Sequence, residues 1–164
     1  MSRVIDNVVI SFKGVFEFET LYKQMRKWFK DRNYVVTETI YKDKAASPFG
    51  HEVEWRFNPE KQVTQYVKYK IEIFFKFEHI KEMNANIKGK DKKVTEGKAK
   101  LTIVHAEVEY DWQNKFSGEW TSKLKKFMHK TFKMYYAIKY EDPLYQEIKD
   151  FQTSLKKILD MNAT

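Results

Sequence analysis

Apolar and polar residues alternate along much of the chain, most clearly over residues 63–78. In this segment one set of alternate positions is mostly apolar, and the other set is mostly charged or polar. A period of two places one side of a β-strand in the core and the other in water, as in an antiparallel sheet. The same pattern predicts strands over 8–18, 34–42 and 51–57, with a loop over 42–50 and a strand end at Asn58-Pro59.

A helix is predicted between the first two strands, over roughly 20–32. Its apolar residues recur at the i, i+4, i+7 and i+8 positions that share one helical face. These residues are Leu21, Met25, Trp28 and Phe29. We therefore expect this helix to pack on the sheet through that face.

The middle of the chain predicts a long hairpin. The alternation weakens beyond residue 78 and reaches the segment KGKDKK at 88–93, where Gly89 and Asp91 indicate the turn. The chain returns through 94–112, in which the apolar positions move from one face to the other near residues 103–104. Such a switch predicts a β-bulge or a bend.

Two helices are predicted at the end of the chain, over 119–140 and 143–160. Asp142-Pro143 fits the N-cap and first position of the second helix, which predicts a break between the two. In the first helix we expect the apolar side to pack on the sheet. That side comprises Leu124, Phe127, Met128, Thr131, Met134, Tyr135 and Ile138. The second helix has an apolar seam that suits antiparallel packing on the first. The seam comprises Leu144, Ile148, Phe151, Leu155 and Ile158.

These elements predict an α+β fold in the order β-α-β-β-β-β-α-α. The expected architecture is a curved, mostly antiparallel sheet of about five to six strands with helices on one face, similar to a helix grip. We expect a single domain over 1–164, with the sheet and first helix in 1–118 and two C-terminal helices in 119–160.

The composition excludes several classes of protein. The chain has 164 residues, no cysteine and no apolar run approaching the length of a membrane span. No secretory signal is apparent, so we expect a cytoplasmic protein. The four histidines are scattered, and no nucleotide-binding or nucleophile motif is present. We therefore expect a non-enzymatic protein without a metal or other cofactor.

The net charge of +8 predicts contact with an acidic partner, unless it reflects composition alone. Between Lys123 and Lys139 there is no acidic residue, whereas a helix that is merely soluble usually mixes charges. The leading hypothesis is contact with RNA or a ribonucleoprotein surface through lysines on the helix and at the hairpin tip. The candidate residues are Lys123, Lys126, Lys130 and Lys133 on the helix and Lys88, Lys90, Lys92 and Lys93 at the tip.

Three alternatives stay open. A helix-grip cavity lined by Phe132 and Tyr136 would carry a small apolar ligand or lipid. A homo-oligomer would form through the 143–160 seam or an open sheet edge. Docking on an anionic membrane surface ranks lower, because the apolar face of 119–140 is expected to be covered by the sheet.

Several segments resemble a family of small uncharacterised archaeal proteins. These segments include KQVTQYVKYKIEIFFKF, KVTEGKAKLTIVHAEVEYDW and YEDPLYQEIKDF. The resemblance covers most of the chain in order and implies one compact cytoplasmic domain. It implies no activity, cofactor or functional residue.

Overall fold

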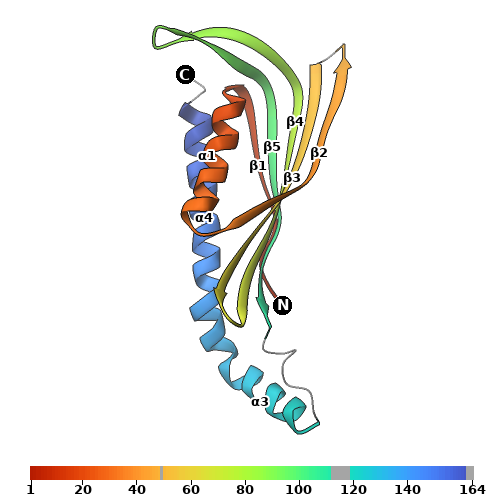
Figure 1. Cartoon of the computed structure of the whole chain (residues 1–164), viewed down its shortest axis with the longest axis vertical. Helices are drawn as coiled ribbons and strands as arrows, with labels where there is room; N and C mark the ends of the chain where they lie inside the picture. The colour runs from red at the N-terminus through yellow and green to blue at the C-terminus, as the bar shows by residue number, and fades with distance from the viewer. Residues whose placement is uncertain (49, 112–118, 162–164) are drawn as a thin grey trace.

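The computed structural model describes residues 1–48, 50–111 and 119–161, which form an antiparallel sheet with helices on one face (Figure 1). The five strands of the described residues pair in the order β1-β5-β4-β3-β2. β2 to β5 therefore form a meander, and the last strand, β5, also pairs with the first, β1. The strands are β1 (Ser2–Phe16), β2 (Val35–Ser47), β3 (Gly50–Thr64), β4 (Val67–Ile87) and β5 (Lys90–Tyr110). The helical elements are α1 (Phe18–Asp31), α3 (Glu119–Tyr136), the π-helical turn η1 (Ala137–Glu141) and α4 (Asp142–Met161). The predicted α+β class, the curved sheet and the helix-grip-like arrangement are confirmed.

Three strand boundaries differ from the prediction. β2 continues to Ser47 through the segment predicted to be a loop, and β3 continues through Pro59 to Thr64. Pro59 has no N–H to donate, but the flanking pairs Phe57–Ile73 and Glu60–Lys70 keep β3 in register with β4. The strand predicted from residue 63 begins instead at Val67, after a two-residue turn. In each case pairing with neighbouring strands outweighs the local sequence signal.

The predicted bulge near residues 103–104 is confirmed. His105 pairs with Glu72 and Ile103 pairs with Ile73, so Val104 is an extra residue on β5 opposite β4. On the neighbouring strand β1, Asn7 lies opposite Val104 in register and has a positive φ of 50°. Along β5 the buried residues change from odd positions, such as Leu101 and Ile103, to even positions, such as Ala106 and Val108. β1 changes in the same way between Ile5 and Phe16, as the sequence pattern requires.

A second bend carries the β4–β5 hairpin over the helices (Figure 1). The register shifts between Glu78 and Lys81, where His79 has a φ of 56°. Gly97 faces this bend, and a Cβ there would lie 3.0 Å from the Glu78 carbonyl oxygen. The hairpin ends in a two-residue turn at Lys88 and Gly89, both with positive φ, as a type I′ turn requires.

Aromatic rings fill the space between the sheet and the helices α1 and α4. The α1 residues predicted to face the sheet are all buried, and Phe29 of α1 contacts Phe151 of α4 at a ring distance of 4.9 Å. The seam of α4 is therefore buried against α1 and the sheet, and the predicted packing of this seam on the preceding helix is wrong. A seam that is buried in this way is not available for self-association.

The polar face of the sheet is crossed by ion pairs, as the alternation of acids and lysines predicts. Glu72 on β4 lies 3.4 Å from Arg56 on β3 and 3.4 Å from His105 on β5. Lys70 and Glu109 form another cross-strand pair at 2.7 Å. These pairs account for His105 and for much of the charge on this face without a catalytic role.

The C-terminal helical region contains no break at Asp142-Pro143. Asp142 has helical backbone angles, so it is not an N-cap, and the chain passes from α3 to α4 through η1. A proline inside a helix removes one backbone donor and its ring crowds the preceding turn. The wider π-helical turn directly before Pro143 accommodates both effects without ending the helix.

Candidate binding surface on the projecting helix

α3 extends beyond the ends of the strands instead of packing on them (Figure 1). The described side chains that were predicted to pack on the sheet are exposed, so that prediction is wrong. The α3 apolar stripe, as we call it, comprises Leu124 (58% exposed), Phe127 (64%), Met134 (77%) and Tyr135 (53%) of α3 and continues to Ile138 (61%) in η1. Thr131, on the same side, is exposed as well, whereas the side chain of Met128 lies outside the described residues. The sheet face is already covered by α1 and α4, and α3 lies past its end.

A row of lysines runs along α3 beside this stripe. Lys123, Lys126, Lys130 and Lys133, the α3 lysine arc, fall within about 80° of the helix circumference at 100° per residue. All four side chains are exposed. Lys139 adds a further cation in η1, and its ammonium donates a hydrogen bond to the Tyr135 hydroxyl at 3.0 Å. That hydrogen bond raises the pKa of Lys139, so its charge is kept.

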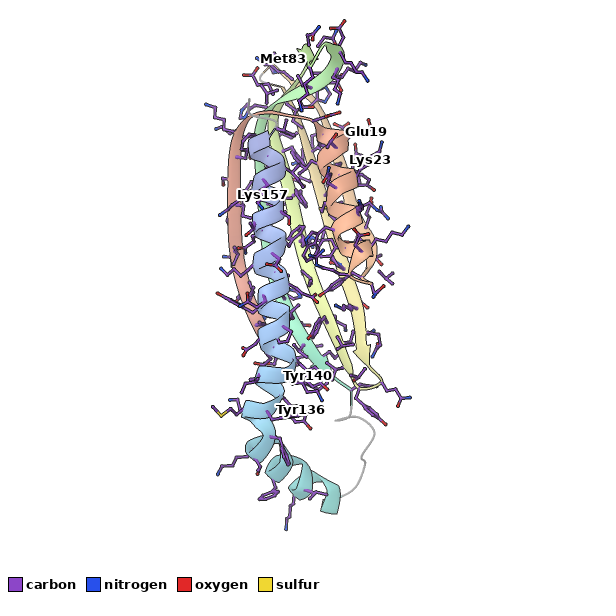
Figure 2. All side chains as sticks on the ribbon, turned by 90° about the vertical axis from the view of Figure 1, so that its left-hand side faces the viewer. Glu19, Lys23, Met83, Tyr136, Tyr140 and Lys157 are labelled. Atoms are coloured by element: carbon purple, nitrogen blue, oxygen red, sulfur yellow. The ribbon has the colours of Figure 1, made fainter. Side chains whose placement is uncertain are left out.

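The hairpin lysines lie at the opposite end of the molecule from α3. Figure 1 shows the β4–β5 hairpin at one end of the long axis and α3 at the other, and Figure 2 places Met83 and Tyr136 in the same way. Lys88, Lys90, Lys92 and Lys93 are all exposed, and Lys92 lies 3.6 Å from the Glu17 carboxylate. The structure therefore does not bring the two groups of predicted site residues together on one face.

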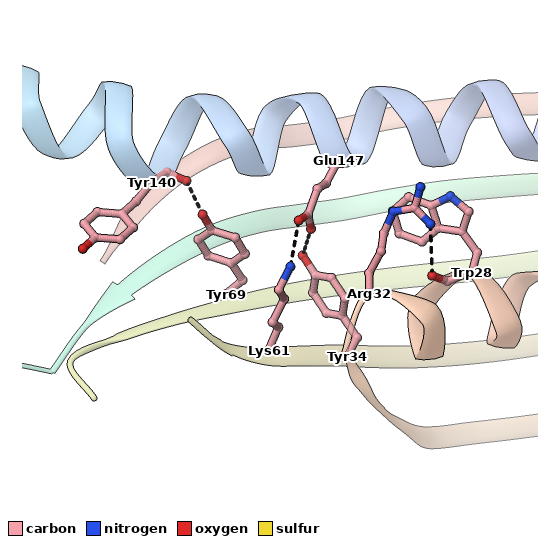
Figure 3. A network of polar contacts seen from close by, with 7 residues as sticks. All are labelled: Trp28, Arg32, Tyr34, Lys61, Tyr69, Tyr140 and Glu147. Carbon is pink, nitrogen blue, oxygen red and sulfur yellow. Dashed lines mark hydrogen bonds and ion pairs between the residues drawn. The ribbon is translucent and has the colours of Figure 1, made fainter. Parts of the chain in front are cut away.

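Tyrosines attach the base of the projecting helix to the sheet. Tyr69 of β4 donates a hydrogen bond of 2.8 Å to the Tyr140 carbonyl oxygen in η1 (Figure 3). Tyr136 packs against Tyr110 of β5 at a ring distance of 5.7 Å and stacks with Tyr140 at 6.3 Å. η1 is thus held to the sheet at the point where α3 leaves it.

A second polar contact holds α4 to β3 and to the connection between α1 and β2. Glu147 accepts hydrogen bonds from the Tyr34 hydroxyl at 2.5 Å and from the Lys61 ammonium at 2.8 Å (Figure 3). Burial, and then the hydrogen bond to Glu147, raise the pKa of Tyr34 far above its ordinary value. The hydroxyl is therefore held protonated and is not activated as a base or nucleophile. This network has the character of a structural clamp.

The network could not be found from the sequence, because Tyr34, Lys61 and Glu147 are far apart in the chain and lie in a connection, a strand and a helix. In the sequence, Glu147 is only a carboxylate beside the seam residue Ile148.

The exposure of the α3 apolar stripe was missed for a different reason. Periodicity shows that a helix has an apolar face, but it does not show what covers that face.

Among the described residues, the cavity that the carrier hypothesis places at Phe132 and Tyr136 is not formed. Phe132 is 42% exposed on α3, and Tyr136 packs on other tyrosines, so the two do not line a pocket between helix and sheet. A cavity of about 710 Å³ lies near the other end of the sheet, with Phe18, Tyr41 and Ile80 among its lining residues. Another, of about 400 Å³, lies between α1 and α4.

The described residues hold no cluster of three or more acidic or histidine side chains able to ligate a metal ion. None of the described helices has both the length and the apolar character needed to cross a membrane.

No family model, curated protein or solved structure matches the chain. The resemblance to archaeal proteins consequently stays a prediction.

Proposed function

We propose that this protein is a non-enzymatic, peripheral binding module that docks on anionic membrane surfaces through α3. The observation that carries the proposal is the exposure of the α3 apolar stripe directly beside the α3 lysine arc. A helix that lies in the membrane interface combines these two features: the apolar face enters the acyl boundary and the cations meet the anionic headgroups.

The charge distribution favours a lipid surface over a second copy of the chain. Two α3 helices joined through their apolar stripes would bring two lysine arcs near each other, with no acidic residue between Lys123 and Lys139 to pair with them. An anionic surface supplies the missing counter-charge for every lysine at once.

The magnitudes show why the apolar stripe matters more than the charge. Four lysines near an anionic surface contribute about 4 kcal/mol, which alone corresponds to a dissociation constant of about 1 mM. Each apolar side chain that is fully removed from water adds about 1.5–3 kcal/mol. Insertion of even two stripe residues therefore adds as much as the whole lysine arc.

RNA remains the second candidate, because the acid-free lysine arc also fits phosphates. The two candidates differ in what they require of the stripe: RNA contact uses the lysines and leaves Leu124 and Phe127 in water. Substitution of the arc lysines should therefore abolish RNA binding, whereas substitution of Leu124 and Phe127 should not.

Sedimentation with lipid vesicles tests the proposal. We expect the full chain to bind vesicles of phosphatidylcholine mixed with phosphatidylglycerol and to stay in solution with phosphatidylcholine alone. The double variant Leu124→Ser/Phe127→Ser should weaken vesicle binding at least tenfold, with the lysine arc intact. The matched control is Val35→Ser, which changes an exposed apolar residue on the edge strand β2.

A parallel titration with fluorescent RNA separates the two candidates. If the double variant keeps full vesicle binding, or if the protein binds RNA and ignores anionic vesicles, the membrane proposal is wrong. A variant with all four arc lysines changed to Glu should lose vesicle binding and should also lose any RNA binding.

A further inference from the structure

A groove of about 400 Å³ lies between α1 and α4, away from α3 and the hairpin lysines. The two helices run side by side in Figure 2, where Lys157 is labelled on α4. We call this cavity the helix groove. Met25, Phe151 and Leu155, each 1% exposed, contribute its apolar floor.

The indole of Trp28 lines this groove and has an unused hydrogen-bond donor. Trp28 is only 9% exposed, and its buried Nε1–H finds no hydrogen-bond partner among the described residues. Buried polar groups in folded proteins are nearly always hydrogen-bonded, so an orphan donor beside a cavity indicates a missing acceptor.

Arg32 adds donors and positive charge at the same place. Its guanidinium lies over the Trp28 ring at 3.9 Å and donates one hydrogen bond to the Trp28 carbonyl oxygen at 3.4 Å (Figure 3). A guanidinium has donors and no acceptor, so it cannot satisfy the indole N–H. The indole N–H lies in the ring plane and the guanidinium lies over the ring face, so an acceptor at the ring edge could accept hydrogen bonds from both.

The rim of the groove is cationic overall. Lys27, Arg32 and Lys157 line it, against one carboxylate, that of Asp31, among the described side chains. Cations above an apolar floor favour an occupant with an anionic head and an apolar body. At about 30 Å³ for each small group, the volume of a water molecule in the liquid, the groove holds roughly a dozen heavy atoms.

We propose that the helix groove binds a medium-chain alkyl carboxylate. One carboxylate oxygen accepts a hydrogen bond from Trp28 Nε1, and the carboxylate pairs with the Arg32 guanidinium. The alkyl chain lies on the floor formed by Met25, Phe151 and Leu155. This site is separate from the membrane-docking surface and does not depend on it.

The indole N–H resonances of the full chain give a direct readout. In protein labelled with ¹⁵N at tryptophan, the variant Trp28→Phe identifies the Trp28 signal by its absence. Titration with sodium decanoate, kept below its micelle concentration, should move the Trp28 signal downfield while the Trp55 signal stays in place. Decan-1-ol has the same chain without the charge, and it should bind at least tenfold more weakly.

Substitutions separate this site from general alkyl adsorption. Arg32→Met should weaken decanoate binding about tenfold or more, whereas Arg26→Met, on the same helix but paired with Glu38 outside the groove, should leave it unchanged. Asp31→Asn should tighten binding, because it removes a carboxylate that lines the rim and repels an anion. All titrations are repeated in the Leu124→Ser/Phe127→Ser background, which should give the same affinities.

Three results would overturn the proposal. They are a Trp28 signal that does not move with decanoate, equal binding of decanoate and decan-1-ol, and an Arg32→Met variant with unchanged affinity. The first would mean that water satisfies the indole, and the other two would mean that the carboxylate is not recognised. The Arg32→Met variant keeps the test decisive if Trp28→Phe does not fold, because Arg32 is only half-buried.

Discussion

Tyr69, which donates a hydrogen bond to the Tyr140 carbonyl oxygen, predicts that the protein loses stability at alkaline pH. Replacement of Tyr69 by Phe should make this loss smaller. Tyr69 is 2% exposed, and its hydroxyl lies 2.8 Å from the oxygen that it binds in η1. Tyr69→Phe removes this hydrogen bond and keeps the ring. At neutral pH we expect the free energy of unfolding to fall by about 0.5–1.5 kcal/mol, the usual net value of one hydrogen bond.

The pH dependence gives the sharper test. Burial, followed by the nearby charges of Glu147 and Tyr140, raises the pKa of Tyr69 from 10.0 to about 12. Below pH 10 the hydroxyl keeps its proton in both the folded and the unfolded chain. Between about pH 10 and 12 only the folded chain keeps it, so the free energy of unfolding falls by about 1.4 kcal/mol per pH unit, or about 2.7 kcal/mol in all.

Urea unfolding at several pH values between about 8 and 11.5 measures both effects. Tyr69→Phe should be less stable than the natural protein at the lower pH and should lose stability less steeply above pH 10, so that the two curves converge. Tyr34 and Tyr110 also have raised pKa values, to which the charge of Tyr69 contributes after burial and nearby carboxylates. Removal of the Tyr69 hydroxyl therefore reduces their contribution to the slope as well, in the same direction. Tyr41→Phe, at an exposed tyrosine, is the matched control. Parallel curves for Tyr69→Phe and the natural protein would refute the reasoning.

Three further predictions test the architecture. Phe127→Ala on the projecting helix should cost less than about 0.5 kcal/mol of unfolding free energy, whereas Phe151→Ala in the core should cost about 3–5 kcal/mol; equal costs would mean that α3 is packed after all. Gly97→Val should lower stability by about 1–3 kcal/mol in thermal unfolding, because its Cβ would meet the Glu78 carbonyl oxygen at 3.0 Å, and a neutral effect would contradict the tight second bend. A double-mutant cycle with Glu147→Gln and Lys61→Met should give a coupling energy of about 0.5–3 kcal/mol, and additive effects would show that the clamp contributes nothing.

The strand faces and the bulge could be predicted because a period of two is a strong local signal. Val53, Trp55 and Phe57 are buried on one side of β3 as expected, and the switch of faces at residues 103–104 appears as the bulge at Val104. The strand ends were less predictable. Pro59 reads as a stop locally, yet strand pairing on both of its sides carries β3 past it.

The candidate sites depended on information that the sequence does not carry. The α3 lysine arc and the hairpin lysines are separated by fewer than forty residues, but the curved hairpin and the projecting helix place them at opposite ends of the molecule. The helix groove depends on the meeting of Trp28 with Phe151, which lie on different helices. Periodicity predicts each helix separately and does not predict which helices become neighbours.

The projecting position of α3 also bears on how its sequence can change over evolutionary time. Because Leu124 and Phe127 are more than half exposed, their substitution by a polar residue is expected to carry little penalty for folding. Drift under selection for stability alone would therefore replace these side chains, and exposed apolar patches are in addition a liability for aggregation. A stripe of this kind would be retained over evolutionary time only if another selective pressure, such as the proposed surface docking, acted on it.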